Sequence, residues 1–396
     1  MTSTADATDL STARRWSMLG ATVAAQASSS VAINGPAFLI PAFVQDRGLS
    51  LVGAGTVVAM TLVGVLVSLI AWGLVVDRVG ERSVLLTGLG GTAVAGAALT
   101  FVHGALAMGA LLFVVGVFAA SSSSASGRIV VGWFPPHRRG LAMGIRQMAQ
   151  PLGVALGAAT MAVTASREGV EAALWIPVAA TLVALVATWA LVRDPARPEA
   201  TAALTANPYK QDAFLLRIHA VSVLTVIPQF LVWTYSLAWL VQERHWSAGS
   251  AGALIAVTHV VGALGRIGAG ALSDAVASRV RPLRWVALAA GVTMLLLGIS
   301  ESLGIAVVLM VVASTVTVAD NGLAFTSVAE RAGAFWSGRA LGAQNTAQYL
   351  AAAAVAPVAG LTITSWGYAA TFGVAAAFPL VAVPLVPRQD AEVTHR

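Results

Sequence analysis

The chain has 396 residues, of which 58% are hydrophobic and only 10% are charged, and it contains no cysteine. About a quarter of the residues of a water-soluble globular protein are charged, so this composition excludes a soluble enzyme, a disordered chain and a fibrous repeat. The lack of cysteine excludes disulfides, thiolate metal sites and cysteine nucleophiles. The composition predicts an all-α membrane protein that crosses the bilayer many times.

A helix that crosses a bilayer needs about 20 mainly apolar residues. Charged residues, prolines and glycines divide the chain into runs of this length, and each run predicts one transmembrane helix. The twelve predicted spans are 16–43, 52–76, 83–102, 105–133, 140–165, 172–192, 214–241, 250–272, 283–300, 303–327, 338–364 and 367–387.

The basic residues predict the orientation, because cytoplasmic loops carry an excess of Lys and Arg. With the N-terminus in the cytoplasm, the outer loops hold only Arg47, Arg167 and Arg244 of the 23 basic residues. Both termini of this multi-pass protein are therefore predicted to be cytoplasmic, in the plasma (inner) membrane. The basic surface then faces the lipid headgroups of the inner leaflet, so the lipid bilayer and no nucleic acid is the expected partner.

The chain repeats itself after about half its length. Three short segments recur at an offset of 197 or 198 residues: 44–47 with 241–244, 73–77 with 270–274, and 140–144 with 338–342. The repeat predicts two parallel six-helix halves, 1–192 and 214–396, which the cytoplasmic linker 193–213 joins. Parallel six-helix halves are known from one large class of secondary transporters.

A glycine-rich, charged turn follows the second span. Residues 73–82 read Gly-Leu-Val-Val-Asp-Arg-Val-Gly-Glu-Arg. They resemble the loop 2–3 motif of the major facilitator superfamily, Gly-x-x-x-Asp-Arg-x-Gly-Arg-Arg, with Glu81 at the first closing basic position. The copy at 270–274 is degenerate, because Ala275 stands where the motif has Arg. The resemblance extends over nearly the whole chain and implies a transporter that works by alternating access.

The motif implies a set of gate residues: Gly73, Asp77, Arg78, Gly80, Arg82 and Asp274. Asp77 lies at a helix end, where backbone N–H groups at the N-terminus of a facing helix can bind its charge. The resemblance implies that this contact holds the cytoplasmic side closed. The alternative is that the charged residues of the motif only fix the topology of the loop.

Polar residues inside membrane spans are costly, which makes them candidates for substrate contact. The candidates lie on spans 1, 7, 8, 10 and 11, and the family resemblance implies that these spans line or adjoin the cavity. They are Gln26, Asn34, Gln229, Trp233, His259, Arg266, Asn321, Gln344 and Gln348. The alternative for the amides is hydrogen bonding across the interface of the two halves, and for Trp233 it is contact with lipid or with the core.

Arg266 lies eight residues before Asp274, roughly 12 Å deeper along the helix, which is too deep to reach water easily. The run 265–274 resembles helix 8 of the monocarboxylate and oxalate/formate-type branches, whose Arg binds the substrate carboxylate. Where the monocarboxylate branch has an Asp for proton coupling, this chain has Gly262. Asp320 is the predicted proton-coupling residue instead, and an internal ion pair between Arg266 and Asp320 is the alternative. Arg128 and Arg146 lie nearer the cytoplasmic ends of their spans and are predicted to be structural.

The sequence predicts a permease that moves a small organic anion, foremost a monocarboxylate, with protons as a coupled ion. No phosphate-binding loop and no nucleophile–base pair is recognisable, so no enzyme, cofactor, metal site or obligate protein partner is expected. One alternative is efflux of a drug or metabolite by proton antiport. Residues 150–153 match only part of the antiporter motif of drug exporters, which disfavours it. The alternative from another class is a non-transporting membrane receptor on the same fold.

Overall fold

A computed structural model describes residues 11–196, 199 and 201–390. These residues form α-helices and two short 3-10 helices, and no strand occurs among them. Within this described part, eleven helical segments are long and apolar enough to cross a membrane. The chain divides into two compact units, each of which takes most of its residues from one half of the sequence.

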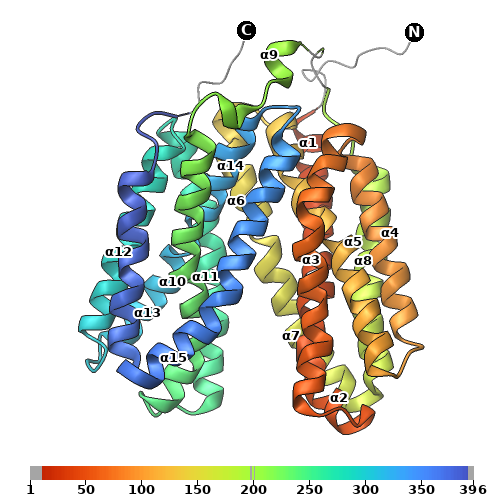
Figure 1. The fold of residues 1–396 in the computed structure, drawn as a ribbon, viewed down its shortest axis with the longest axis vertical. Helices are drawn as coiled ribbons and strands as arrows, with labels where there is room; N and C mark the ends of the chain where they lie inside the picture. Colours follow the sequence, from red (N-terminus) through yellow and green to blue (C-terminus); the bar gives the residue numbers. More distant parts are fainter. Residues whose placement is uncertain (1–10, 197–198, 200, 391–396) are drawn as a thin grey trace. The chain divides into compact units, whose positions relative to one another are not determined.

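Unit 1 comprises residues up to Phe134, Met148–Ala206 and Gly333–Ala343. Its helices follow the first six predicted spans, and it also contains the first residues of α15 (Figure 1). The helices are α1 (Thr12–Asn34), η1 (Gly35–Leu39), α2 (Ile40–Arg47), α3 (Leu51–Val79), α4 (Glu81–Leu99), α5 (Ala105–Trp133), α7 (Ala149–Glu168), α8 (Val170–Leu191) and α9 (Ala202–Thr205).

Unit 2 comprises Pro135–Gln147 and the described residues from Asn207 onward, except Gly333–Ala343. Each unit thus includes one short segment from the opposite predicted half, and the division into halves at 193–213 stays a prediction. The helices of unit 2 are α6 (Pro136–Gln147), η2 (Pro208–Lys210), α10 (Phe214–Gln242), α11 (Ala248–Ala275), α12 (Val280–Ile299), α13 (Ala306–Val316), α14 (Asp320–Ala332) and most of α15 (Ser337–Leu385).

The last helix, α15, explains why the structure has eleven candidate spans where the sequence predicts twelve. It runs for 49 residues, and a straight helix of that length would extend about 74 Å, more than twice the roughly 30 Å of the hydrocarbon core. Gly367 has a φ of 79°, and the ribbon of α15 reverses its direction (Figure 1). Thr371 Oγ1 donates to Thr362 Oγ1 across this turn at 3.2 Å. The two arms match the predicted spans 338–364 and 367–387, and the count of twelve stays a prediction.

Three other predicted spans are interrupted close to polar residues. The fifth span, 140–165, is divided between α6 and α7 at Met148, next to Gln147. The first span contains the 3-10 helix η1, which begins with Gly35 and Pro36, and a proline removes a backbone hydrogen bond from the helix. The tenth span is broken into α13 and α14 by a turn over 317–319. Broken membrane helices expose backbone groups and helix ends, which transporters use to bind substrates and ions.

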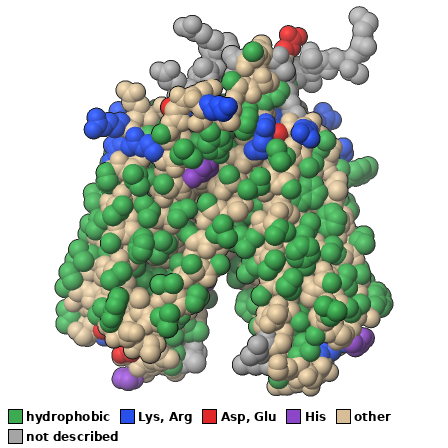
Figure 2. Space-filling view, in the orientation of Figure 1, with side chains coloured by type: hydrophobic (Ala, Val, Ile, Leu, Met, Phe, Trp, Pro, Cys, Tyr) green, Lys and Arg blue, Asp and Glu red, His purple; other side chains and the backbone are tan. Residues whose placement is uncertain are grey.

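Each unit has its own apolar core and a largely apolar surface. Phe43, Met108 and Met161 belong to the core of unit 1, while Trp239 and Phe372 belong to the core of unit 2. On the face shown in Figure 2, hydrophobic side chains cover most of each unit, and most of its Lys and Arg side chains gather at one end. A surface of this kind suits contact with lipid acyl chains along the helices and with headgroups at the basic end.

Glycines allow α3 and α5 to pack backbone against backbone in unit 1. A Cβ atom placed on Gly116 would lie 2.0 Å from the carbonyl oxygen of Thr61, and one on Gly64 would lie 2.1 Å from that of Phe113. Both distances are far below van der Waals contact. Small residues at helix crossings are a main source of stability in membrane bundles, so these two positions require glycine.

We expect Gly116→Ala to destabilise the protein by about 1–3 kcal/mol, because the added methyl group forces α3 and α5 apart. The matched control is Gly20→Ala on α1, where an added Cβ would meet nothing within 4 Å. It should leave stability unchanged or raise it slightly, since alanine favours helix more than glycine does. Thermal unfolding of both variants in detergent measures the difference. Equal midpoints for the two variants would contradict the packing argument.

Candidate functional site

Arg266 is a deeply buried cation in unit 2. It lies on α11 with 2% of its surface exposed, and its Nη1 donates to the carbonyl oxygen of Gln147 at 2.5 Å. Gln147 is the last residue of α6, and the carbonyls at a helix C-terminus carry partial negative charge. The guanidinium also lies over the ring of Trp233, 5.8 Å from its centroid. Its Nη2 is buried and has no hydrogen-bond partner.

Asp320 is a buried carboxylate in the same unit, 1% exposed. It is the first residue of α14, directly after the break in the tenth predicted span. A negative charge in the first turn of a helix is favoured by the helix dipole. Thr225 Oγ1 on α10 donates to Asp320 Oδ2 at 2.5 Å, and the backbone N–H groups of Asp320 and Asn321 also stabilise the charge of the carboxylate. Asp320 Oδ1 is buried, and no group among the described residues meets it with full hydrogen-bond geometry.

The charges of Arg266 and Asp320 interact electrostatically, but they form no direct ion pair. No carboxylate oxygen in the described part of the chain lies within 4.0 Å of the Arg266 guanidinium nitrogens. The sequence alternative of a closed internal pair is therefore absent from this structure. Because burying an incompletely compensated charge is costly, two such groups with unfilled hydrogen-bonding positions mark a candidate binding site.

An amide chain adjoins Asp320 and joins three of the predicted residues. Asn321 Nδ2 donates to Gln229 Oε1 at 2.9 Å, and Gln348 Nε2 donates to Asn321 Oδ1 at 3.1 Å. The three amides come from α14, α10 and α15 respectively. Their bonds tie the start of α14 to two other helices, which fixes the position of Asp320 at the helix break.

Two aromatic rings complete the surroundings of Arg266. The ring of His259 meets that of Trp233 edge to face, with centroids 5.5 Å apart, and Phe230 lies 5.5 Å from Trp233 on its own helix. His259 precedes Arg266 by seven residues, which is about two turns of α11 on the same face. The structure thus brings Trp233, His259, Arg266 and Asp320 into one cluster.

Gln344 belongs to a different network. Its Oε1 bonds to His219 Nδ1 and its Nε2 donates to Ser222 Oγ, while Tyr209 of η2 bonds to His219 Nε2 at 2.9 Å. The amide oxygen of Gln344 can only accept, so His219 carries its proton on Nδ1 and donates to Gln344, which links α10 to α15. Nε2 then accepts from the Tyr209 hydroxyl, whose pKa burial raises to about 12.

Gln26 and Asn34 lie in unit 1, among residues of α1 and α5. Gln26 Nε2 donates to Ser123 Oγ at 3.3 Å, and Ser126 Oγ donates to Gln26 Oε1 at 3.5 Å. Asn34 Nδ2 donates to the carbonyl oxygen of Ser30 at 3.0 Å on its own helix. The contacts of Gln26 join α1 to α5, as in helix packing, whereas the contacts of Asn34 stay within α1. A role of either residue in substrate binding stays a prediction.

In unit 1, the carboxylate of Asp77 binds the N-terminus of a facing helix, as the motif implies. The N–H groups of Gly338 and Arg339, at the start of α15, donate to its two carboxylate oxygens at 2.9 and 3.1 Å. Arg339 Nε adds a third bond at 2.8 Å. The approach needs glycine on both sides, because a Cβ atom on Gly73 would lie 2.4 Å from the carbonyl oxygen of Gly338.

The remaining motif residues anchor the loop between α3 and α4. Gly80 has a φ of 98°, a conformation that favours glycine. The Arg82 N–H donates to Asp194 Oδ1 at 2.7 Å, and its Nη2 donates to the carbonyl oxygen of Trp189 at 2.8 Å. Arg78 is exposed. The contacts of Arg82 are those of a loop anchor, so its gate role stays a prediction.

An ion pair beside Asp77 was missed by the sequence reasoning. Arg128 Nε lies 2.7 Å from Glu81 Oε1, and its Nη1 lies 3.6 Å from Asp77 Oδ1. Glu81 is the position that departs from the family motif, and its side chain is fully buried. The available signal was an acidic residue at a basic position of the motif, combined with an arginine near the cytoplasmic end of the fourth predicted span. The structural role predicted for Arg128 is this pairing.

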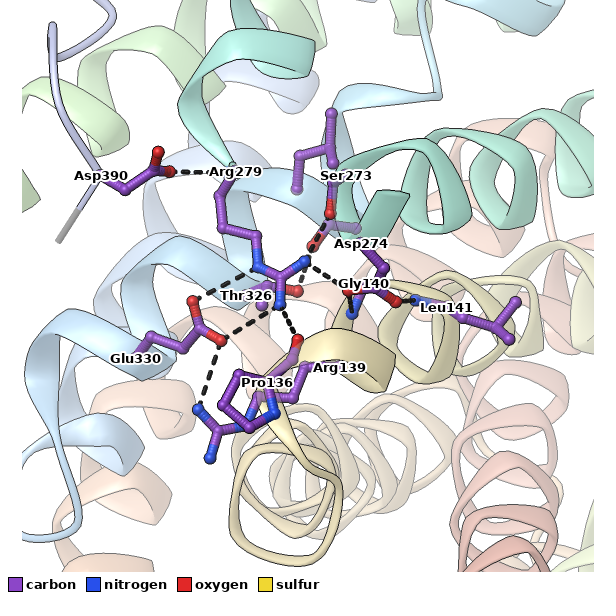
Figure 3. Close-up of polar contacts among 12 residues, drawn as sticks. Pro136, Arg139, Gly140, Leu141, Ser273, Asp274, Arg279, Thr326, Glu330 and Asp390 are labelled. Atoms are coloured by element: carbon purple, nitrogen blue, oxygen red, sulfur yellow. Dashed lines mark hydrogen bonds and ion pairs between the residues drawn. The ribbon is translucent and has the colours of Figure 1, made fainter. Parts of the chain in front are cut away.

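Asp274 forms the equivalent contact in unit 2 (Figure 3). The N–H groups of Gly140 and Leu141, in the first turns of α6, donate to its carboxylate oxygens at 2.9 and 2.8 Å. A Cβ atom on Gly140 would lie 2.3 Å from the carbonyl oxygen of Gly270. The sequence repeat is therefore also a repeat of geometry, in which an aspartate binds the N-terminus of a facing helix.

Arg279 supplies the cation that the degenerate motif copy lacks at Ala275. Its Nη1 donates to Asp274 Oδ1 at 2.5 Å, its Nη2 donates to the carbonyl oxygen of Pro136 at 2.5 Å, and Glu330 lies 3.4 Å away (Figure 3). Burial lowers the pKa of Arg279, but Glu330 and Asp274 together raise it above its usual value, so it stays charged. Sequence reasoning missed it, because the motif gives no reason to look five residues past Asp274.

The buried Arg146 of α6 was predicted to be structural. Its Nη1 donates to Gln147 Oε1 at 2.7 Å, and its guanidinium lies 5.6 Å from the ring centroid of Phe325. These contacts lie within unit 2, at the end of α6 where the Gln147 carbonyl binds Arg266. Arg146 thereby holds the segment that positions Arg266.

The family model and the sequence relative that match this chain both belong to one superfamily of transporters. A family model described as Major Facilitator Superfamily matches residues 21–357. An uncharacterized MFS-type transporter of Mycobacterium tuberculosis is 45% identical over 378 residues, which cover 94% of this chain and 85% of that protein.

Two solved structures share the fold at low sequence identity. The MFS transporter FucP of E. coli, in its outward conformation, has a TM-score of 0.75 and 16% identity over 93% of this chain and 97% of its own. The human organic anion transporter MFSD10 (TETRAN) has a TM-score of 0.73 and 19% identity over 94% of this chain and 99% of its own.

Proposed function

Because the chain belongs to the major facilitator superfamily, we propose that it moves a small organic anion across the membrane by alternating access. The chain is a transporter and not an enzyme. The observation that carries the anion proposal is the buried guanidinium of Arg266, whose Nη2 has no hydrogen-bond partner among the described residues. A carboxylate is the natural partner, since guanidinium binds it with paired, charge-assisted hydrogen bonds. Among carboxylates, monocarboxylates lead, because the cluster contains one such cation.

The structural neighbours indicate which classes of substrate to compare, organic anions and sugars. The human neighbour is an organic anion transporter, which agrees with the proposal, whereas the E. coli neighbour is a fucose:proton symporter. A neutral sugar has no group that would neutralise Arg266. A sugar substrate would therefore leave the cation uncompensated at its buried position.

Exchange in proteoliposomes tests the anion proposal for either direction of transport. Proteoliposomes that contain the purified protein are loaded with a mixture of unlabelled C2 to C6 monocarboxylates. The entry of labelled acids of the same series is then measured by counterflow. We expect at least one labelled acid to enter saturably. Other acids should inhibit this entry, whereas fucose and xylose should not. Sugar entry that no acid inhibits would overturn the proposal. Binding of an acid without counterflow would favour the receptor alternative.

We further propose that Asp320 couples transport to protons. It lies next to the break between α13 and α14, and it interacts with Arg266 without a direct bond. When a substrate carboxylate neutralises Arg266, the cation no longer stabilises the charge of Asp320, so the aspartate takes up a proton more readily. Anion and proton would then move together as a symport.

Asp320→Asn should remove the dependence of the uptake rate on pH. The amide keeps the shape of the side chain but cannot titrate, so we expect substrate binding to remain and the pH dependence of uptake to become flat. Asp212→Asn is the matched control, since Asp212 forms an ion pair with Arg331 at an exposed position. An unaltered pH profile in a folded, active Asp320→Asn variant would show that Asp320 does not couple protons.

We propose that both termini lie on the cytoplasmic side of the plasma (inner) membrane. The chain lacks cysteine, so single cysteines can be introduced without a background. We expect cysteine at the exposed Arg167 to react with an impermeant maleimide in intact cells, and cysteine at the exposed Arg138 or Lys210 to react only after permeabilisation. Labelling of position 138 in intact cells would reverse the orientation.

A further inference from the structure

We propose that Arg266 and Asp274 hold the two ends of α6 against α11, and that a ligand of Arg266 loosens this α6–α11 contact. α6 has 12 residues. Near its start, the N–H groups of Gly140 and Leu141 bind the Asp274 carboxylate. At its end, the carbonyl oxygen of Gln147 accepts a hydrogen bond from Arg266 Nη1 at 2.5 Å. The part of the inference that concerns the ligand rests on the proposed function, because it takes Arg266 as the binding site of the anion.

The charges of the two side chains suit the ends of α6 that they bind. A helix carries partial positive charge at its N-terminus and partial negative charge at its C-terminus. The carboxylate of Asp274 binds near the start of α6, and the guanidinium of Arg266 binds at its end. Arg279 strengthens the start with a bond to the carbonyl oxygen of Pro136. At the end of α6, Arg266 supplies the charge that α11 contributes.

Between these ends, α6 and α11 pack backbone against backbone. A Cβ atom on Gly270 would lie 2.1 Å from the carbonyl oxygen of Gly140, and one on Gly144 would lie 2.6 Å from that of Arg266. Both distances are far below van der Waals contact. Because glycine adds no side chain to the α6–α11 contact, α6 depends on the bonds at its two ends for its attachment to α11.

The sequence leaves the carbonyl oxygen of Gln147 available for Arg266. In a continuous α-helix, this oxygen would accept from the N–H of residue 151. Residue 151 is a proline, which has no N–H to donate, and the helix is interrupted at Met148. Arg146 Nη1 donates to the side-chain oxygen of the same glutamine at 2.7 Å. Gln147 is therefore held by two guanidinium groups, and its backbone acceptor binds that of Arg266.

The repeat in unit 1 shows that close packing alone does not require an arginine at this position. At the offset of 197 residues, Asp77 matches Asp274, but Leu69 matches Arg266. The backbone approach is kept, because a Cβ atom on Gly342 would lie 2.7 Å from the carbonyl oxygen of Leu69. Leu69 is fully buried. Arg266 thus adds a charge-dependent bond to a contact that an apolar side chain can also accommodate.

An anion at Arg266 would compete with the Gln147 carbonyl for the guanidinium. An anion carries a full negative charge and the carbonyl only a partial one, so the guanidinium is drawn toward the ligand. Only the bonds at the start of α6 then remain, and the α6–α11 contact opens more often. If this contact closes the cytoplasmic side, as the family motif implies for Asp274, ligand binding promotes opening to the cytoplasm.

Alkylation of a cysteine on α6 tests the role of Arg266 without any ligand. Ala142 is fully buried, so Ala142→Cys reports the opening of the α6–α11 contact to a water-soluble maleimide. In purified protein, we expect Arg266→Leu to raise the alkylation rate about tenfold or more. Arg284→Leu is the matched control, because Arg284 donates to the carbonyl oxygens of Val386 and Pro387 and not to α6. It should leave the rate unchanged.

Two further measurements distinguish local opening from general loss of structure. Ala287 on α12 is fully buried, and Ala287→Cys should react at the same rate with and without Arg266→Leu. A rise at both cysteines would overturn the inference. If Arg266→Leu alone fails to fold, Arg266→Leu with Asp320→Asn leaves neither buried charge alone, and its rate at position 142 should exceed that of Asp320→Asn about tenfold.

A double variant tests whether both ends hold the same helix. Contributions from independent sites add in free energy, so Arg266→Leu should raise the rate at position 142 about tenfold in the Asp274→Asn background as well. Equal rates in that background, with and without Arg266→Leu, would show that Arg266 does not hold α6.

The acid mixture of the counterflow experiment tests the action of the ligand. It should raise the rate at position 142 toward that of Arg266→Leu, and it should leave the rate of Arg266→Leu unchanged. Acids that exchange by counterflow without changing the rate at position 142 would overturn the action of the ligand and leave the proposed function standing. If no acid binds or exchanges, the proposed function fails, while the rates without ligand still decide whether Arg266 holds α6.

Discussion

Replacement of Arg266 by lysine is expected to lower the affinity for organic anions by about tenfold or more. Lysine keeps the positive charge but loses the planar fork that binds a carboxylate through two parallel hydrogen bonds, and a hydrogen bond to a charged group contributes about 1.5–3 kcal/mol. It also loses the geometry that allows Arg266 to bind the Gln147 carbonyl and Trp233 together. Arg266→Gln removes the charge as well and should lower the affinity further.

Equilibrium binding of labelled acid to purified variants measures this effect separately from transport. Arg284→Lys is the matched control, because Arg284 lies on α12 and donates to the carbonyl oxygens of Val386 and Pro387, away from the cluster. It should bind acids with unchanged affinity. The structural alternative makes a different prediction: Arg266→Gln and Asp320→Asn would each fail to fold, and the double variant would recover expression because neither charge is left alone.

Asp77→Asn is expected to open the contact between α3 and the start of α15. The carboxylate accepts three hydrogen bonds from Gly338 and Arg339, and an amide offers only one acceptor oxygen and no charge. The loss of about 1.5–3 kcal/mol should increase the population of the open state about tenfold or more. If the contact holds the cytoplasmic side closed, as the family motif implies, the variant will favour the state that is open to the cytoplasm.

The alkylation rate of a buried cysteine reports on this opening. Ala340 is fully buried and directly follows Arg339 of the contact, so Ala340→Cys should react at least about tenfold faster in the Asp77→Asn background. The same design applies to the repeat in unit 2, with Asp274→Asn and a cysteine at the buried Ala142. Asp212→Asn, at an exposed pair, should change neither rate, since surface ion pairs contribute little. Unchanged reactivity and unchanged transport in Asp77→Asn would end the gate proposal.

The class of the protein and the positions of most helices follow from composition and local pattern. Runs of about 20 apolar residues without charge have one stable form in a bilayer, because a helix satisfies every backbone hydrogen bond within the run. The contact at Asp77 was also within reach of the sequence, since a glycine-flanked aspartate at a helix end needs a partner with free N–H groups. The repeat extended that expectation to Asp274, where the structure has the same bonds.

Most contacts between side chains could not be predicted from the sequence. The pairing of Arg128 with Glu81 and of Arg279 with Glu330 joins helices that cross at angles and depths that no local pattern encodes. The helix break at 317–319 contains no proline or glycine, so the residues within it gave no reason to predict a break.

The same limit explains how the candidate site residues are divided. Gln229, Trp233, His259, Arg266, Asp320, Asn321 and Gln348 lie in connected contacts of unit 2, while Gln344 bonds to His219 and Gln26 bonds to serines of α5. All of these residues look alike from the sequence, since each is a polar group on an apolar span. Which of them meet depends on the rotation and crossing of whole helices, and these are set by the packing of many apolar side chains at once.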